Sequence, residues 1–126
     1  MSVAIIGGGS WGTALAIHAA RSGAGGRLWA REREVVEAIR TRRRSPWYLA
    51  DIDVPPVVEP TTDQGEALRG ATLVIVAVPS EFVATALKAL PPIPTDVPIV
   101  SATKGLDPER HLRMSEVIVE RFPDEF

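Results

Sequence analysis

The stretch 3-VAIIGGGSWGTALA-16 decides the fold, because an uncharged apolar run passes directly into three glycines and then into small residues at helical spacing. Val3 to Ile6 predicts a strand buried on both faces, as in a parallel sheet. Residues 11–21 predict a helix, and Gly23 is placed to end it. Glycines directly after a buried strand indicate that the backbone there must come close to another group.

Strand patterns and helix patterns alternate along the rest of the chain. Further strands are predicted over 26–30, near 57–58, over 72–79 and over 99–105, and further helices over 32–43, 63–69, 80–90 (capped by Ser80) and 109–121. Continuous apolar strands that alternate with helices predict a doubly wound parallel α/β sheet, formed by a single domain over 1–126. Ligands of such sheets bind beyond the carboxyl ends of the strands.

Composition narrows the classes of function. A formal net charge of −2 over 126 residues argues against a general nucleic-acid binder. Cysteine is absent, so disulfides and thiolate chemistry are excluded. No apolar run approaches the ~20 residues of a membrane span, and no secretory signal is visible, so we expect a cytoplasmic protein without a membrane partner.

One run of like charge, Arg40 to Arg44, stands at the end of the helix predicted from residue 32. Acidic residues early in that helix and arginines late in it are the order that the helix dipole favours. We therefore interpret the run as a helix end, with a phosphate or membrane patch as the alternative.

Gly7, Gly9 and Gly12 have the G-x-G-x-x-G spacing between a predicted strand and a predicted helix. In that context the pattern indicates dinucleotide binding. Gly7 would permit the tight turn, Gly9 would let a pyrophosphate approach the backbone, and Gly12 would let the helix pack closely on the strand. The N-terminus of the helix would then hold the phosphates.

The end of the second predicted strand bears on the choice of cofactor. Arg31 comes first and could accommodate the 2′-phosphate of NADPH, whereas an acid there would bind the 2′-hydroxyl of NADH. Glu32 follows directly and is interpreted as an acid of the first helical turn, and Arg33 could add a second cation. We therefore favour NADPH over NADH.

Two further residues follow predicted strands. Lys104 ends the last strand beside Gly105 and would point into the ligand crevice, where it could meet a phosphate or a carbonyl oxygen. Phe82 follows the strand over 72–79 and would either shield a nicotinamide ring or pack beneath the next helix. His18, within a helix, and His111, at the start of one, are interpreted as structural.

Six segments occur in the order seen in NAD(P)-dependent glycerol-3-phosphate dehydrogenases: GGGSWGTALA (7–16), LWARE (28–32), PWYL (46–49), AVPSEF (77–82), SATKGLDP (101–108) and MSEVI (114–118). The chain resembles the cofactor-binding part of that family over residues 3–122. The resemblance implies a Rossmann-like fold and reversible hydride transfer between NAD(P)H and dihydroxyacetone phosphate, which gives sn-glycerol 3-phosphate for phospholipid synthesis.

The resemblance also implies roles for single residues. Ser10 and Trp11 resemble the residues that meet the cofactor phosphates, Arg31 and Tyr48 those on the adenosine side, and Phe82 the residue near the nicotinamide. Lys104 resembles a residue that touches both cofactor and substrate. The fingerprint glycines complete the expected cofactor site.

The chain also departs from the family. GLDP stands where many members have GLEP, and PWYL lacks the usual preceding asparagine. Members are much longer, and their acid–base lysine lies in a helical domain that this sequence does not include. We therefore expect no catalytic residue and no turnover here, and an exposed sheet edge that invites self-association. The alternatives are a related dehydrogenase, such as a hydroxyacid or ketopantoate reductase, and a non-catalytic dinucleotide sensor.

Overall fold

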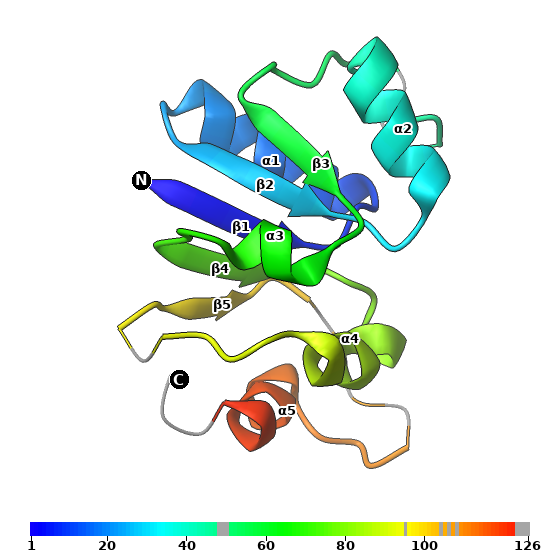
Figure 1. Ribbon diagram of the computed structural model, residues 1–126. Coiled ribbons are helices and arrows are strands. Elements are labelled where there is room, and N and C mark those ends of the chain that lie inside the picture. The colour runs from blue at the N-terminus through cyan, green and yellow to red at the C-terminus, as the bar shows by residue number, and fades with distance from the viewer. Residues whose placement is uncertain (48–50, 95, 104, 106, 108, 123–126) are drawn as a thin grey trace.

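The computed structural model describes all residues except 48–50, 95, 104, 106, 108 and 123–126. They form a parallel sheet of order β3-β2-β1-β4-β5 with helices on both faces (Figure 1). The strands are β1 (Ser2–Ile6), β2 (Gly25–Trp29), β3 (Val58–Thr61), β4 (Leu73–Val76) and β5 (Ile99–Ser101). The helices are α1 (Ser10–Arg21), α2 (Arg33–Arg42), α3 (Gln64–Leu68), α4 (Val83–Ala89) and α5 (Met114–Arg121), with a 3₁₀ turn at Ser80–Phe82. The predicted doubly wound fold is confirmed.

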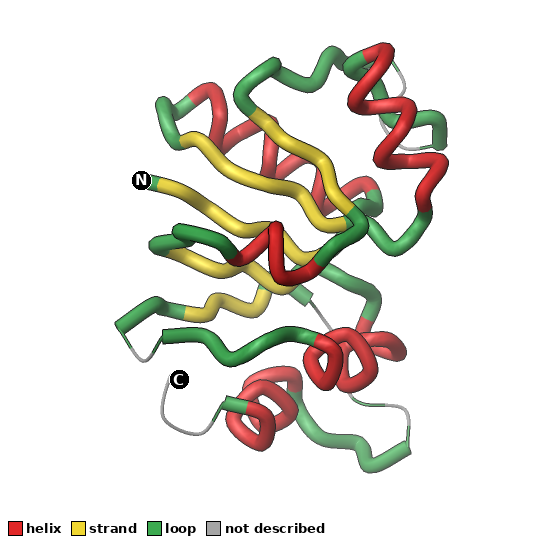
Figure 2. The backbone as a smooth tube through the Cα atoms, in the orientation of Figure 1, coloured by secondary structure: helices red, strands yellow, loops and turns green. Residues whose placement is uncertain are grey.

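The sheet separates two apolar clusters. One face of the sheet packs against α1 and α2 through residues such as Ile17 and Ile39. The other packs against α3, α4 and α5 through residues such as Leu87 and Ile118. Figure 2 shows that the chain crosses from one face of the sheet to the other in the connection from β3 to β4. The strands β2 and β3 lie on one side of β1, and β4 and β5 lie on the other. A crevice therefore forms at the carboxyl ends of β1 and β4, where the strand order reverses.

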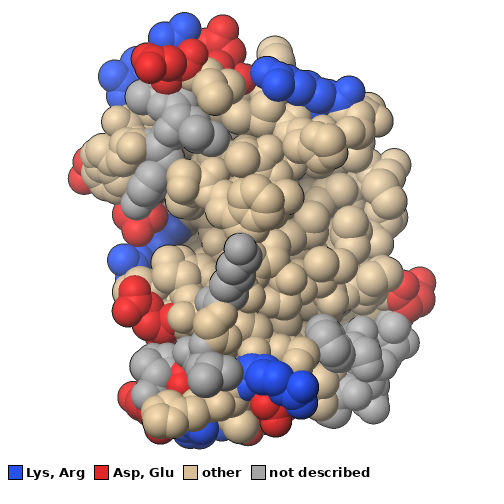
Figure 3. All heavy atoms as spheres, turned by 180° about the vertical axis from the view of Figure 1, so that it is seen from behind, with Lys and Arg blue, Asp and Glu red and all other residues tan. Residues whose placement is uncertain are grey.

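Charge is distributed unevenly over the surface. The face seen from behind in Figure 3 carries its charged side chains mainly at the rim and uncharged atoms across the middle. Val100 on β5 is 46% exposed, although it belongs to a strand. β5 lies at one edge of the sheet.

Two strands end earlier than predicted. β4 stops at Val76 rather than at 79, and β5 stops at Ser101 rather than at 105. After β5, the hydroxyl of Thr103 donates to the carbonyl of Val78 over 2.6 Å, in place of continued backbone pairing. The prolongation predicted for both strands is therefore wrong, because side-chain bonds replace the ladder at this edge.

Two helices also begin later than predicted. Ser80 does not cap α4: it lies in the 3₁₀ turn, and α4 begins at Val83. α5 begins at Met114 rather than at 109, and His111 lies before it with φ of 57°. Asp107 accounts for the delay, because its carboxylate accepts from the Arg110 N–H and its backbone pairs with residues 111 and 112.

The arginine run ends α2, as interpreted, with Arg40 and Arg42 in the last turn. Arg43 has left-handed backbone geometry and donates to carbonyls of the loop before β3 and, at 2.7 Å, to the carbonyl of Val58, the first residue of β3. Partial burial lowers the pKa of Arg43. Arg44 pairs with Asp53 at 2.7 Å, and this hydrogen bond raises the pKa of Arg44. The run therefore fastens the 54–58 loop to α2.

Candidate functional site

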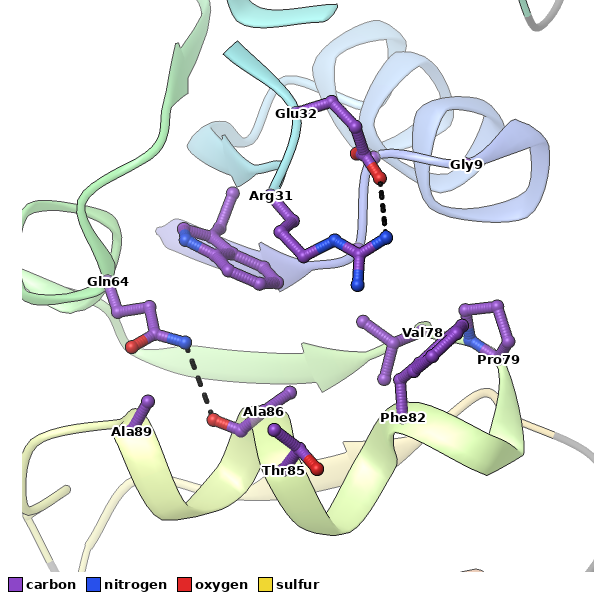
Figure 4. A pocket seen from close by; sticks show the side chains of 13 residues that line it. Gly9, Arg31, Glu32, Gln64, Val78, Pro79, Phe82, Thr85, Ala86 and Ala89 are labelled. Atoms are coloured by element: carbon purple, nitrogen blue, oxygen red, sulfur yellow. Dashed lines mark hydrogen bonds and ion pairs between the residues drawn. The ribbon is translucent and has the colours of Figure 1, made fainter.

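A cleft of about 360 Å³ opens where β1, β2 and β4 end (Figure 4). Its walls come from the glycine loop, from the segment after β2, and from α4 with the turn before it. The lining residues are Gly7, Gly8, Gly9, Trp29, Arg31, Glu32, Gln64, Val78, Pro79, Phe82, Thr85, Ala86 and Ala89. The cleft lies where the topology places a ligand site, beyond the carboxyl ends of the strands.

The glycine loop is shaped by two close approaches. Gly7 has φ of +135°, and a Cβ there would lie 2.7 Å from the carbonyl carbon and oxygen of Ala77. A Cβ at Gly12 would overlap the carbonyl oxygen of Gly7. The turn after β1 and the start of α1 therefore require glycine for packing alone, as the fingerprint predicts for these two positions.

Gly9 differs from both. A Cβ at Gly9 would meet no atom within 4 Å, and its φ of −76° suits any residue. Gly9 is the N-cap of α1, no side chain caps this helix end, and its first turn holds no acidic residue. Open space in front of uncapped helix N–H groups fits an anionic ligand such as a pyrophosphate.

Arg31 and Phe82 meet across the cleft. The guanidinium of Arg31 lies 5.1 Å from the centre of the Phe82 ring, a cation–π distance, and one of its nitrogens is 3.4 Å from the Glu32 carboxylate (Figure 4). The Phe82 residue is 42% exposed and lies on the cleft wall. Arg31 thus links the wall after β2 with the wall before α4.

Glu32 has a different place from the one predicted. It is the N-cap residue of α2 rather than an acid of the first turn, where Glu34 lies instead. Its side chain makes no capping hydrogen bond, lines the cleft and pairs with Arg31. Its position directly after a strand-end arginine was the only sequence signal for this role.

A second hollow of about 480 Å³ adjoins the first and shares Gly9, Val78 and Pro79 with it. Ser10 and Trp11 line this hollow. The Trp11 side chain donates from Nε1 to the carbonyl of Ala102, just after β5, over 3.0 Å, while the residue stays 56% exposed. The indole therefore joins the start of α1 to the end of the last strand.

The structure brings together most of the residues singled out by sequence. Gly7, Gly9, Arg31 and Phe82 share the first cleft, Ser10 and Trp11 line the second, and Gly12 packs behind the loop. Tyr48 and Lys104 lie outside the described residues.

Gln64 and Thr85 also line the cleft, and no sequence pattern marked them. Gln64 reaches it from α3 and donates to the carbonyl of Ala86 over 3.4 Å. Both are brought there by the packing of α3 and α4 on the sheet, which a local pattern does not encode.

No group of three or more potential metal-ligating side chains occurs among the described residues. None of their helices is both long and apolar enough to cross a bilayer. His18 lies within α1, as predicted, whereas His111 does not begin a helix.

A parallel sheet whose first strand turns through a glycine loop into an uncapped helix N-terminus, with an arginine beyond the second strand, defines a dinucleotide-binding domain of the Rossmann class. Within this class, the model of the NAD-dependent glycerol-3-phosphate dehydrogenase N-terminus matches residues 2–126. The chain belongs to this family, and the resemblance seen in its motifs is confirmed.

Individual relatives agree with the family match. Glycerol-3-phosphate dehydrogenase [NAD(P)+] 2 of Salinibacter ruber is 41% identical over 120 residues, which cover 94% of this chain and 35% of the relative. The corresponding Thermus thermophilus protein is 45% identical over 106 residues, or 84% of this chain and 32% of the relative. The crystal structure of glycerol-3-phosphate dehydrogenase from Coxiella burnetii superimposes with a TM-score of 0.81 at 30% identity, covering 95% of this chain and 37% of that one. The chain thus spans about a third of the length of these relatives.

Proposed function

We propose that these 126 residues form one dinucleotide-binding domain of an enzyme that interconverts dihydroxyacetone phosphate and sn-glycerol 3-phosphate with NADPH or NADH. The observation that carries the proposal is the open, uncapped start of α1 at Gly9, within a chain that the family model matches over 2–126. The related dehydrogenases and the non-catalytic sensor are not favoured, because the match is to this family.

Each part of the cleft has a task in this proposal. The N–H groups at the start of α1 hold the pyrophosphate, and the close turn at Gly7 lets it approach. Arg31 contacts the adenosine side. Phe82 and Pro79 form an apolar wall of the same cleft that keeps water from the bound cofactor. The bound nicotinamide would supply or accept the hydride.

The rest of the reaction rests on the resemblance. Lys104 would meet the cofactor and the substrate phosphate or carbonyl, and Tyr48 would lie near the adenosine. The acid–base lysine of the family has no counterpart among these 126 residues, so we propose that they bind cofactor but do not by themselves turn over substrate. A cytoplasmic location and self-association complete the proposal, supported by the cysteine-free composition and by exposed Val100 on an edge strand.

Titration of the chain with NADPH and with NADH, followed by cofactor fluorescence or calorimetry, tests the proposal. We expect saturable binding of at least one nucleotide, and weaker binding of NADPH by Arg31→Ala. Arg33→Ala is the matched control, because Arg33 is a neighbouring exposed arginine that does not line the cleft. Absence of binding to either nucleotide would contradict the proposal for this chain, and reduction of dihydroxyacetone phosphate by it would contradict the expected lack of turnover.

A further inference from the structure

The segment that follows β5 is held on both sides of Lys104. Before it, the Thr103 hydroxyl donates to the carbonyl of Val78 over 2.6 Å. After it, Gly105 has φ of +107°, and a Cβ there would lie 3.0 Å from the hydroxyl oxygen of Ser80, so glycine lets the chain run close to the turn before α4. Thr103, Val78 and Ser80 line the second hollow. Lys104 lies outside the described residues, but both of its chain neighbours are fixed beside that hollow.

The next fixed point along the chain is Asp107, which is only 6% exposed. It is the one buried acidic residue among those that the structure describes. A buried carboxylate is tolerated when hydrogen bonds replace the water that it has lost. The carboxylate of Asp107 accepts from the backbone N–H of Arg110 over 2.9 Å, and its main chain pairs with His111 and Leu112, each over 2.8 Å. Asp107 therefore closes the loop that leads into α5.

Arg110 ties this loop to α5. Its guanidinium lies 3.7 Å from the Asp107 carboxylate through Nε and 2.8 Å from the Glu120 carboxylate through Nη1. Glu120 belongs to α5, which packs on the sheet through buried Ile118. The chain after Lys104 is thus braced against a helix, and the chain before it is braced against the end of β4.

The backbone at His111 depends on these contacts. Its φ of 57° is a left-handed conformation that residues other than glycine rarely adopt, and such a conformation persists where surrounding contacts impose it. The N–H of His111 donates to the carbonyl of Asp107, and the preceding N–H donates to the Asp107 carboxylate. Loss of the carboxylate should therefore release this turn, and with it the chain back to Gly105.

We propose that Asp107 is a positioning residue, which holds the segment 103–107 so that the ammonium group of Lys104 meets the bound cofactor. The inference rests on the function proposed above, because it assumes that Lys104 contacts the cofactor. A lysine side chain is long and flexible, so its contact with a ligand depends on where the backbone is held. Asp107 lines neither the cleft nor the second hollow, so it acts on the ligand through the segment that it holds.

The chain has two lysines, Lys88 and Lys104, and this allows a test by lysine acetylation. The rate of acetylation at each lysine is measured by peptide mass spectrometry, with and without saturating NADPH or NADH, whichever binds more tightly. In the unaltered chain the nucleotide should slow acetylation of Lys104 about tenfold, the usual worth of a hydrogen bond to a charged group. Lys88 lies on α4 outside the cofactor cleft, so its acetylation should not change and it serves as the internal control.

Asp107→Ala removes the acceptor of the Arg110 N–H, and loss of such a bond should reduce the protection of Lys104 to less than about twofold. The dissociation constant of the nucleotide should rise less than about fivefold, because an exposed ion pair contributes no more. Asp107→Asn keeps an oxygen that accepts the bond, so it should retain protection of about fivefold or more. Glu109→Ala is the matched control, because it removes an exposed acid from the same loop.

A purely structural role would expose both lysines alike, whereas a positioning role affects Lys104 alone. If the unaltered chain binds nucleotide and Asp107→Ala leaves Lys104 protected as before, the inference is overturned and the proposed function stands. If nucleotide binds without protecting Lys104 in the unaltered chain, the inference fails while cofactor binding stands. If neither nucleotide binds, the proposed function fails, and this inference fails with it.

Urea denaturation of each variant identifies misfolding. If Asp107→Ala does not fold, Glu120→Ala decides the question, because it removes the exposed partner through which Arg110 braces the loop on α5. Protection of Lys104 should then fall about twofold to fivefold, as expected for an exposed ion pair. Unchanged protection in Glu120→Ala would overturn the inference in that case.

Discussion

Replacing Gly9 by alanine should weaken nucleotide binding strongly while leaving the fold intact. The added methyl group would enter open space, since no atom lies within 4 Å of the position that it would take. The same substitution at Gly12 would place the methyl group on the carbonyl oxygen of Gly7. The two variants add the same group one helical turn apart, and the structure predicts opposite outcomes for them.

The effects on stability follow from these surroundings. At Gly9, alanine is a poorer N-cap than glycine, but it restricts the unfolded chain, and each effect is worth about 0.5–1 kcal/mol with opposite sign. The free energy of unfolding should therefore change by less than about 1 kcal/mol. At Gly12 the obstacle is rigid backbone, and overpacking of this kind should lower the free energy of unfolding by about 2 kcal/mol or more.

Gly9→Ala should affect nucleotide binding more than it affects stability. A methyl group at Gly9 keeps the phosphates away from the uncapped N–H groups of α1, and the loss of one or two charge-assisted hydrogen bonds weakens binding about tenfold to a hundredfold. Urea denaturation and NADPH titration of both variants measure the two quantities. If Gly9→Ala binds NADPH as tightly as the unaltered chain, the ligand does not lie against this backbone. If it unfolds like Gly12→Ala, the space in front of α1 is not open.

Three further substitutions test other contacts. Arg43→Ala should lower the free energy of unfolding by about 1–3 kcal/mol, measured in urea, because the carbonyls of the 54–58 loop lose a partly buried donor. Trp11→Phe should lower the free energy of unfolding by about 1 kcal/mol, because it removes one hydrogen bond between α1 and the end of β5 and leaves an aromatic ring. Because Trp11 also lines the second hollow, we expect a larger loss in the free energy of nucleotide binding. Glu116→Gln should flatten the acid limb of the stability curve in a pH titration of thermal unfolding. The backbone N–H and the side chain of Arg113 lower the pKa of Glu116 in the folded state, so its contribution is present at neutral pH and is lost as the pH falls through that lowered pKa.

A different outcome would contradict each of these three predictions. Arg43→Ala as stable as the unaltered chain would mean that solvent satisfies the loop carbonyls equally well. Equal loss of stability and affinity in Trp11→Phe would mean that the indole only supports the fold. An unchanged acid limb in Glu116→Gln would mean that this carboxylate titrates alike in the folded and unfolded chain.

Local patterns predicted the elements whose causes are local. The strand at the N-terminus, the glycine turn and α1 follow from an apolar run, a required positive φ at Gly7 and small residues at helical spacing. The ends of β4 and β5 could not be read in this way, because the first glycine or proline beyond each strand is Pro79 and Gly105, respectively. A hydroxyl from Thr103 that reaches the carbonyl of Val78, 25 positions earlier, ends the pairing instead.

The late start of α5 has a comparable cause. Residues 109–113 have a composition compatible with helix, but Asp107 captures the N–H of Arg110 and directs the chain through a left-handed residue at His111. An aspartate followed three residues later by a free N–H is also the pattern of a helix cap, so the sequence alone does not separate the two outcomes.

The preference between NADPH and NADH cannot be predicted from single residues. Sequence reasoning assigned Arg31 to the ligand and Glu32 to the helix, because each residue type has a familiar role at its own position. The structure puts both side chains on one cleft wall, 3.4 Å apart, with Phe82 on the far side of the arginine. The charge met by a ribose 2′-substituent is then a property of the pair. An arginine after the second strand therefore favours NADPH only to the extent that its neighbour leaves the positive charge uncompensated.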